Sequence, residues 1–428
     1  MSVDILIRNG RVIDPANGVD NVTDITIRDG LIATVGGNPA AGFSPAETID
    51  ATGYIVCPGL VDLCARLREP GAEYKANVRS ETRAAARAGI TLMCLPPDTD
   101  PVIDEPAVVE LIQQRAQAFH SAGVVTLGAL TTRLAGQQLS EIAALKEAGC
   151  VGVSNALQPM QDNRVLRHAM EYALTNDMTL HVTALDHGLA ARGVAHLGVT
   201  SSILGLQGIP VSAETVAIAQ YLALIEEVGV RTHFGRLSSA RAVEMIADAK
   251  ARGLPVTADV AIHNLHLTEE AISHFNTQAH VIPPLRSAAD RDALQEGLRS
   301  GVIDAICSDH QPHELDAKLN PFPSTSPGIS GIDTLLGLSL QLVEQMDISL
   351  NQVLGALTAA PANILGVKAG SLSAGAPADI CIVDPQPVWR VTRESMYSAG
   401  KNTPFLDTEL PGQVMHTLIG GQIVERTV

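Results

Sequence analysis

The residues of this chain that are best able to do chemistry stand in short polar motifs that follow apolar runs. One motif places Cys64 and Arg66 two residues apart after the apolar run 59–63, and on a strand such residues point to the same face. Another motif is SDHQPH at 308–313, which contains Asp309. Thiolates and carboxylates bind metal ions, whereas an arginine cannot, because its guanidinium stays protonated and has no lone pair to donate. The pattern therefore indicates a site that is arranged like a metal centre but carries a fixed positive charge.

The composition favours a cytoplasmic protein with reduced cysteines and an aliphatic core. The 428 residues are 46% hydrophobic but only 3% aromatic, so the core must consist of aliphatic side chains. The net charge of -17 argues against nucleic acid or an anionic membrane as a partner, since both need a positive surface. Six dispersed cysteines without a CxxC pair, no signal-peptide pattern and no apolar run long enough to cross a bilayer complete this expectation.

The middle of the chain alternates short apolar runs with helical patterns. Eight strands alternating with eight helices predict a (β/α)8 TIM-like barrel of class α/β over residues 58–366. The strands are expected at 59–63, 91–95, 124–128, 151–153, 179–182, 231–234, 256–260 and 305–308. The helices are expected at 80–88, 106–119, 139–148, 164–175, 213–227, 240–251, 288–300 and 331–346.

Both ends of the chain read as short strands separated by tight turns. Asn9-Gly10, Asp29-Gly30 and Gly420-Gly421 can supply the positive φ that hairpin turns need. Strands are expected at 4–7, 11–13, 24–28 and 31–35, and again at 378–383, 414–418 and 423–424. We therefore predict a small β-sandwich domain that is built from residues 1–57 and 367–428.

Five motifs together resemble the amidohydrolase superfamily, and within it the type I dihydroorotases. They are PGLVD at 58–62, LREPG at 67–71, PPLR at 283–286, SDHQPH at 308–313 and NTPF at 402–405. The resemblance covers nearly the whole chain. It implies a barrel whose mouth, in active relatives, holds one or two zinc ions that activate a water and polarise the amide carbonyl of dihydroorotate.

The resemblance also implies that most of the metal ligands have been replaced. Six ligand positions can be compared, and they hold Cys64, Arg66, Asn155, His181, Arg236 and Asp309. Only His181 and Asp309 are the expected residue types, while a catalytic zinc site needs three protein ligands. Arg66 and Arg236 would repel a dication strongly even at an effective dielectric of about 20. We expect no zinc, no catalytic residue, and a salt bridge from Asp309 to one of the two arginines.

The substrate pocket that the resemblance implies is altered as well. Arg68 stands where the family grips the substrate carboxylate, and His313 is retained in a ring-contacting position. Asp98 and Ile282 replace two asparagines, and a carboxylate at position 98 would repel an acidic substrate. Cys64 is expected to be a buried free thiol; a less favoured alternative is a nucleophile whose pKa nearby guanidinium groups lower.

Families close to dihydroorotase include inactive chains that assemble with aspartate carbamoyltransferase in bacterial pyrimidine synthesis. The resemblance implies such a non-catalytic subunit, which also forms a homo-oligomer, a dimer. One alternative is a cyclic amidohydrolase with residual or altered-metal activity. Another is a small-molecule sensor that uses the remaining pocket, with Arg68 holding a carboxylate.

Overall fold

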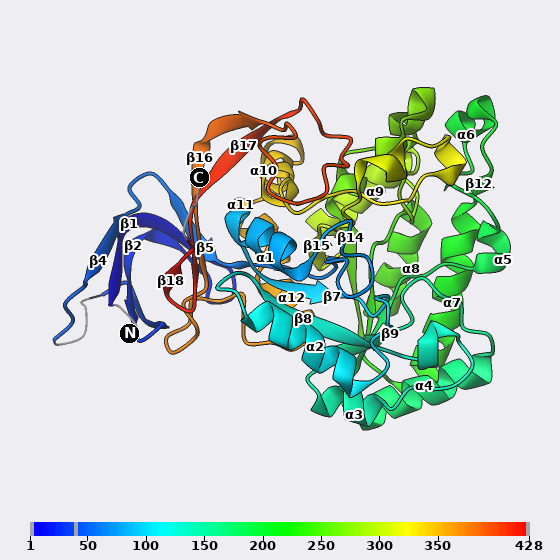
Figure 1. Ribbon diagram of the computed structural model, residues 1–428, viewed down its shortest axis with the longest axis horizontal. Coiled ribbons are helices and arrows are strands. Elements are labelled where there is room, and N and C mark those ends of the chain that lie inside the picture. Colours follow the sequence, from blue (N-terminus) through cyan, green and yellow to red (C-terminus); the bar gives the residue numbers. More distant parts are fainter. Residues whose placement is uncertain (1–3, 38–41, 425–428) are drawn as a thin grey trace.

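The computed structural model describes residues 4–37 and 42–424 and contains two large sheets (Figure 1). The central sheet is parallel throughout. Its strands, in spatial order, are β6 (Leu60–Asp62), β7 (Ile90–Leu95), β8 (Gly123–Ala129), β9 (Gly152–Ser154), β10 (Thr179–Val182), β13 (Thr232–Phe234), β14 (Val256–Ala261) and β15 (Ala305–Cys307). Just beyond β6 and β15, the Arg66 N–H donates to the His310 carbonyl at 2.9 Å, which joins the two ends of the sheet. The predicted barrel and each of its strands are confirmed.

Helices follow the strands and cover the outside of the barrel (Figure 1). The predicted ones are α1 (Val78–Arg87), α2 (Pro106–Gln117), α3 (Ile142–Glu147), α4 (Asn163–Thr175), α7 (Val211–Val228), α8 (Ala240–Ala251), α9 (Ala288–Arg299) and α10 (Leu335–Gln345). In α1, a reciprocal cap between Asn77 and Ser80 satisfies the first free backbone N–H groups. The opposite end of α1 presents alanines to the barrel, so the helix packs closely on the sheet. No helix in the described part of the chain is long and apolar enough to cross a membrane.

Several short elements were not predicted. An insertion after β10 contains α5 (His187–Ala190), β11 (Ala195–His196), α6 (Val199–Leu204) and β12 (Gly208–Ile209). Two further helices, α11 (Leu350–Leu357) and α12 (Ala359–Leu365), precede the C-terminal strands. The 3-10 helices are η1 (Thr132–Leu134), η2 (Ile262–Leu265), η3 (Glu269–Phe275), η4 (Thr277–Ala279), η5 (Leu315–Lys318) and η6 (Phe322–Ser324). Elements this short give no hydrophobic period over a full window, which explains why they were missed.

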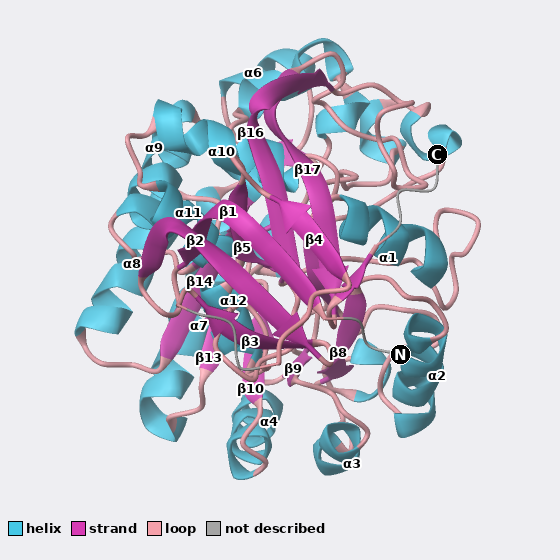
Figure 2. Cartoon of the chain, turned by 90° about the vertical axis from the view of Figure 1, so that its left-hand side faces the viewer, coloured by secondary structure: helices cyan, strands magenta, loops and turns pink. Residues whose placement is uncertain are grey.

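The second sheet takes strands from both ends of the chain (Figure 2). Its path is β18 (Gln422–Ile423), β17 (Glu409–Ile419), β16 (Ile380–Arg390), β5 (Ile55–Pro58), β1 (Ile5–Asp14), β2 (Val19–Arg28) and β3 (Leu31–Val35), with β4 (Glu47–Asp50) beside β1. The turns at Asp29-Gly30 and Gly420-Gly421 are confirmed by positive φ at all four residues. The domain boundaries after residues 57 and 366 stay predictions.

The turn expected at Asn9-Gly10 is wrong, because β1 runs on through these residues. The register of β1 against β2 shifts between Ile7 and Gly10, and Asn9 has a φ of 61°, so the pair forms a bulge. A Cβ at Gly10 would lie 2.5 Å from Val56, and the Asn9 N–H donates to Asp24 at 3.0 Å. A glycine that lets β5 approach closely therefore resembles a turn signal in the sequence.

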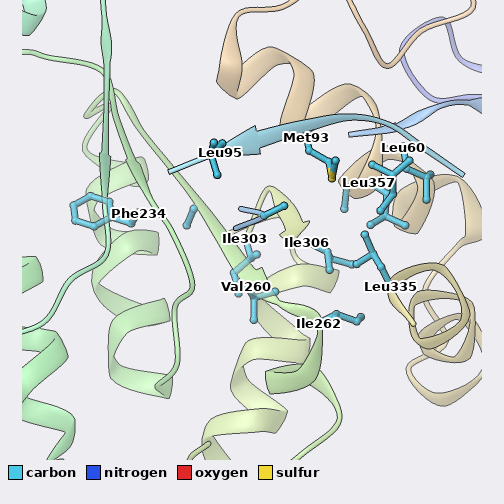
Figure 3. Packing of buried hydrophobic residues seen from close by; sticks show 14 of the residues in the cluster. Leu60, Met93, Leu95, Phe234, Val260, Ile262, Ile303, Ile306, Leu335 and Leu357 are labelled. Atoms are coloured by element: carbon cyan, nitrogen blue, oxygen red, sulfur yellow. The ribbon is translucent and has the colours of Figure 1, made fainter. Parts of the chain in front are cut away.

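The barrel core is aliphatic, as the composition predicts (Figure 3). Figure 3 shows Leu60 and Met93 from the strands close to Leu357 from a covering helix, and Ile306 from a strand close to Leu335. Each such fully buried side chain contributes about 1.5–3 kcal/mol relative to exposure. This packing gives the barrel mouth a rigid support on which polar side chains can be held.

Candidate functional site

The ends of the barrel strands bring most of the predicted site residues to one mouth. Cys64 and Arg66 follow β6, Arg236 follows β13, and Asp309 follows β15. Carboxyl ends of parallel barrel strands converge at one face, where the loops carry the functional groups. Arg236 and Asp309 have φ values of 61° and 43°, so both strands turn sharply where these side chains begin.

A buried network of opposite charges fills the centre of this mouth. Oδ1 of Asp309 lies 2.9 Å from Nη1 of Arg236 and 3.5 Å from Nη1 of Arg66. The side chains of Arg236 and Asp309 are 5% and 1% exposed. Arg66 also donates through Nε and Nη2 to Oδ2 of Asp98, at 2.9 Å in both cases. The predicted salt bridge of Asp309 is confirmed, and it includes both arginines.

Two other polar groups complete this charge network. Nε2 of Gln311 lies 3.2 Å from each carboxylate oxygen of Asp309. Arg236 donates its Nη2 to the hydroxyl of Thr183 beyond β10. The network therefore holds two cations and two carboxylates in one hydrogen-bonded chain, which we call the arginine–aspartate network: Arg66, Asp98, Arg236 and Asp309.

The pKa shifts of Asp309, Arg236 and Arg66 all favour the charged form of the group. Burial alone would raise the pKa of Asp309, but the attraction of Arg236 and Arg66 outweighs it and lowers that pKa below its usual range. Burial alone would likewise lower the pKa of Arg236 and Arg66, but the neighbouring carboxylates, Asp309 and Asp98 respectively, raise both values. The centre of the mouth therefore holds opposite charges that offset each other.

Cys64 borders the network as a free thiol, and it is half-buried where a buried thiol was expected. Its Sγ lies 3.6 Å from Oδ1 of Asp309 and 3.8 Å from Nη1 of Arg66. Burial raises the pKa of this thiol to about 12, and the opposing effect of Arg236 and Arg66 is smaller. The guanidinium groups do lower this pKa, as the alternative of a nucleophilic Cys64 assumes, but burial outweighs them and the net shift is upward.

Two histidine rings lie beside the network in an edge-to-face pair. The ring centroids of His181 and His233 are 5.3 Å apart. Burial, and then His233, lower the pKa of His181 to about 3, and its Nε2 has no hydrogen-bond partner among the described residues. His233 lies 2.8 Å from Asp259 and 2.9 Å from Thr257 through its two ring nitrogens. Sequence reasoning missed the contact with Asp259, although neighbouring barrel strands β13 and β14 carry the two residues.

Asn155 lies near the mouth but bonds away from the network. Its Oδ1 accepts from the Thr131 hydroxyl at 2.7 Å, and its Nδ2 donates to the carbonyls of Leu134 and Gln158 at 3.3 and 3.1 Å. The amide therefore ties together two loops of the mouth. Asn155 lines a cavity of about 80 Å³, and a separate cavity of about 40 Å³ lies beside the network, with Cys64 and Arg236 among its lining residues.

Arg68 and His313 form a second polar cluster at the rim. Nε of Arg68 donates to the Pro312 carbonyl at 3.0 Å, and Nη2 lies 3.1 Å from Nε2 of His313. Nδ1 of His313 lies 3.1 Å from Nζ of Lys75, which also pairs with Glu314 at 3.0 Å. Burial, and then Arg66, lower the pKa of Arg68 to about 10. The rim is therefore rich in positive charge.

Comparison with solved structures shows which proteins share this fold. An L-hydantoinase (dihydropyrimidinase) from Arthrobacter aurescens superposes with a TM-score of 0.86 at 24% identity, covering 99% of this chain and 96% of its own. A D-hydantoinase structure gives 0.84 at 24% identity, covering 98% and 95%. The barrel with a second sheet from both termini is thus the fold that these hydantoinases share.

Sequence comparison identifies the family of this chain. The family model described as dihydro-orotase-like matches residues 53–242. A "Dihydroorotase-like protein" of Pseudomonas aeruginosa is 51% identical over 98% of this chain and 99% of its own, and one of Pseudomonas putida is 49% identical over 99% of both. A "Dihydroorotase" of Trichlorobacter lovleyi is 40% identical over 99% of both chains. The chain belongs to the dihydroorotase-like family.

Proposed function

We propose that this protein is a non-catalytic dihydroorotase-like chain that acts as a structural subunit of a cytoplasmic aspartate carbamoyltransferase assembly. It would support the transferase in pyrimidine biosynthesis and form a dimer of its own. The observation that carries the proposal is the arginine–aspartate network, in which Asp309 bonds to Arg236 and Arg66 at the place of the metal. A protein cation thereby takes over the electrostatic role of the ion.

The residues of the mouth do not fit a zinc ion. His181 and Asp309 are the retained ligand types, and Oδ1 of Asp309 already accepts from Nη1 of Arg236 at 2.9 Å. Zinc would have to approach that oxygen to about 2.0–2.2 Å, which places it beside the guanidinium. At about 4 Å and an effective dielectric of about 20, the repulsion is about 4 kcal/mol per unit of metal charge and per arginine. No catalytic step through a metal is therefore assigned.

The space at the mouth also argues against the alternative of residual hydrolase activity. The cavity beside the network measures about 40 Å³. That volume holds a few water molecules, whereas small-molecule pockets commonly measure about 300–1,000 Å³. A ring-shaped amide with a carboxylate would need the loops to move before it could reach Arg236.

The intact framework around this altered mouth supports a structural role. The barrel, its aliphatic core and the second sheet are complete in the described residues. Two relatives at 49–51% identity have names that stop at "Dihydroorotase-like protein", whereas one at 40% is named "Dihydroorotase". Assembly with the transferase itself comes from the family resemblance.

Sedimentation of purified chains tests the assembly directly. This chain and the catalytic chain of aspartate carbamoyltransferase from the same organism are run separately and mixed, and a hydantoinase of the same fold serves as control. We expect one faster species that contains both chains, and higher transferase activity in that species. No shift on mixing, with unchanged transferase activity, would remove the proposal.

A second candidate function is a sensor for a small carboxylate at the rim. Arg68 makes its observed bonds to a carbonyl and to His313, with no carboxylate partner among the described side chains. Nearby Lys318 is 3% exposed, and burial followed by the charge of Arg68 lowers its pKa to about 7. A bound anion would offset the cost of burying the positive charges of Arg68 and Lys318. Thermal unfolding with carbamoyl aspartate, for the native chain and Arg68→Gln, tests this: a shift in both or in neither rules the sensor out.

A further inference from the structure

We propose that Cys57 and Cys381 form a reversible disulfide when the protein meets a peroxide, and that this bond links the N-terminal and C-terminal parts of the second sheet. Cys57 lies on β5 and Cys381 on β16, which are neighbouring antiparallel strands (Figure 2). The two cysteines stand directly opposite each other in the register of these strands. A bond between them would join positions that are 324 residues apart in the chain.

The backbone brings the two cysteines within the reach of a disulfide. The Gly59 N–H donates to the Asp379 carbonyl at 2.9 Å, two positions further along the same strands. Hydrogen-bonded pairs alternate along antiparallel strands, so Cys57 and Cys381 are also such a pair, with a typical Cα separation of about 5.5 Å. Disulfides span about 4.4–6.8 Å between Cα atoms. Their Cβ atoms lie about 3.5–4.5 Å apart, against about 4.5–5.5 Å for opposite residues, so the strands need only a small approach.

Both thiols point to the same side of the second sheet. Cys57 and Cys381 are 0% exposed and belong to the barrel core, whereas their neighbours Val56 and Ile382 belong to the core of the second sheet. The Cys57 thiol donates to the Cys381 carbonyl at 3.7 Å. A hydrogen bond with the side chain of Cys57, followed by burial, raises the pKa of the Cys381 thiol. The two side chains therefore interact while both are reduced.

This pairing distinguishes the two thiols from the other cysteines. In the described strand registers, Cys57 and Cys381 are the one pair of cysteines that lie opposite each other. Cys150 instead lies 3.5 Å from the Thr126 hydroxyl, and the Cys307 thiol donates to Oδ1 of Asp259 at 3.4 Å. The contacts of Cys150 and Cys307 are thus with oxygen, and the expected bond is specific to β5 and β16.

A peroxide supplies the oxidant for this bond. One thiolate attacks a peroxide oxygen, the O–O bond breaks, and a sulfenic acid forms with release of hydroxide. The second thiolate attacks the sulfenic sulfur, the S–O bond breaks, and a second hydroxide leaves. In total, two thiols lose two electrons and two protons, and hydrogen peroxide becomes two water molecules. Because both thiols are 0% exposed, the first step requires local opening of the sheet.

Peptide mass spectrometry of the full chain tests the bond. The folded chain is treated with hydrogen peroxide, the remaining thiols are alkylated in urea, and the chain is digested. We expect one peptide with Cys57 linked to one with Cys381, and the loss of this link after dithiothreitol. Urea below the unfolding transition should speed the reaction, because opening limits it. No linked peptide, or sulfinic acid at either cysteine in its place, would overturn the proposal.

Two variants and a stability measurement locate the effect. The linked native chain should unfold at a higher urea midpoint than the reduced chain, because the bond restricts the unfolded state. Cys57→Ala should lose both the linked peptide and this rise. Cys150→Ala is the matched control, since Cys150 is also a buried thiol, and it should keep both. An equal rise in Cys57→Ala, or its absence in Cys150→Ala, would refute the site. The linked peptide is measured on the native chain, so a less stable variant does not prevent the test.

Discussion

Replacing Asp309 by asparagine should destabilise the fold more than a change of this size usually does. Asparagine keeps the shape but removes the negative charge that Arg236 and Arg66 share. Arg66 still has Asp98, whereas Arg236, which is 5% exposed, is left with a neutral amide and the Thr183 hydroxyl. Removing one partner of a buried ion pair leaves an uncompensated charge and costs about 3–5 kcal/mol.

Urea unfolding measures this loss through the shift in midpoint and the slope of the transition. The control is Glu244→Gln, which removes the partner of Arg241 from a pair whose side chains are both 61% exposed, and it should leave the midpoint nearly unchanged. If Asp309→Asn loses less than about 1 kcal/mol, the network does not carry the buried charge as we describe.

The native chain and Asp309→Asn also allow a test in which the direction of the pH dependence of stability is predicted. The pKa of Asp309 in the folded chain is lowered, in spite of burial, by Arg236 and Arg66. Its stabilisation is therefore complete above the unfolded value of about 3.9 and is lost as the pH falls through the folded value. The stability difference between native chain and Asp309→Asn should be constant from neutral pH down to mildly acidic pH and should shrink below that unfolded value. A difference that grows on acidification would contradict the reasoning.

Three further outcomes follow from the mouth. Burial lowers the pKa of His181 to about 3, so below about pH 6.5 the unfolded chain binds more protons than the folded chain. The thermal midpoint of the native chain should therefore fall as the pH is lowered from about 6.5 to about 4. The fall should be less steep in His181→Gln. Because the pKa of Cys64 is raised to about 12, a thiol reagent at pH 8 should label it slowly, and the number of rapidly labelled thiols in Cys64→Ser should equal that of the native chain. Joint replacement of Cys64 and Arg66 by His, Asn155 by Asp and Arg236 by His should raise zinc retention in dialysis; retention equal to the native chain would show that these four changes do not explain the loss.

The barrel could be predicted because its strands and helices are long, periodic and aliphatic. The short insertion after β10 could not, since α5, β11, α6 and β12 each contain six residues or fewer. Their formation depends on packing against neighbouring segments. In α6, for example, the Thr200 N–H donates to the carboxylate of Glu269 at 3.2 Å. Such contacts join residues far apart in the chain and leave no local pattern.

The same holds for the site, where one ion pair could be predicted from charge and another depends on the fold. The pairing of Asp309 with an arginine was predictable, because a buried cation needs a nearby anion whatever its position in the sequence. The role of Asp98 was not predictable: we expected its carboxylate to repel an acidic substrate, and in the structure it binds Arg66 at 2.9 Å. That pairing depends on how the loop after β7 turns toward the end of β6. Arg66 and Asp98 are 32 residues apart in the sequence, and no local sequence pattern indicates that they meet.

The zinc content of the purified native chain tests the central claim most directly. After dialysis against micromolar zinc and then against buffer, elemental analysis gives the metal per chain, and a dihydroorotate assay is run on the same sample. We predict far less than one zinc ion per chain and no ring opening, because Arg66 and Arg236 hold the position beside Asp309. One retained zinc per chain together with turnover of dihydroorotate would contradict the claim.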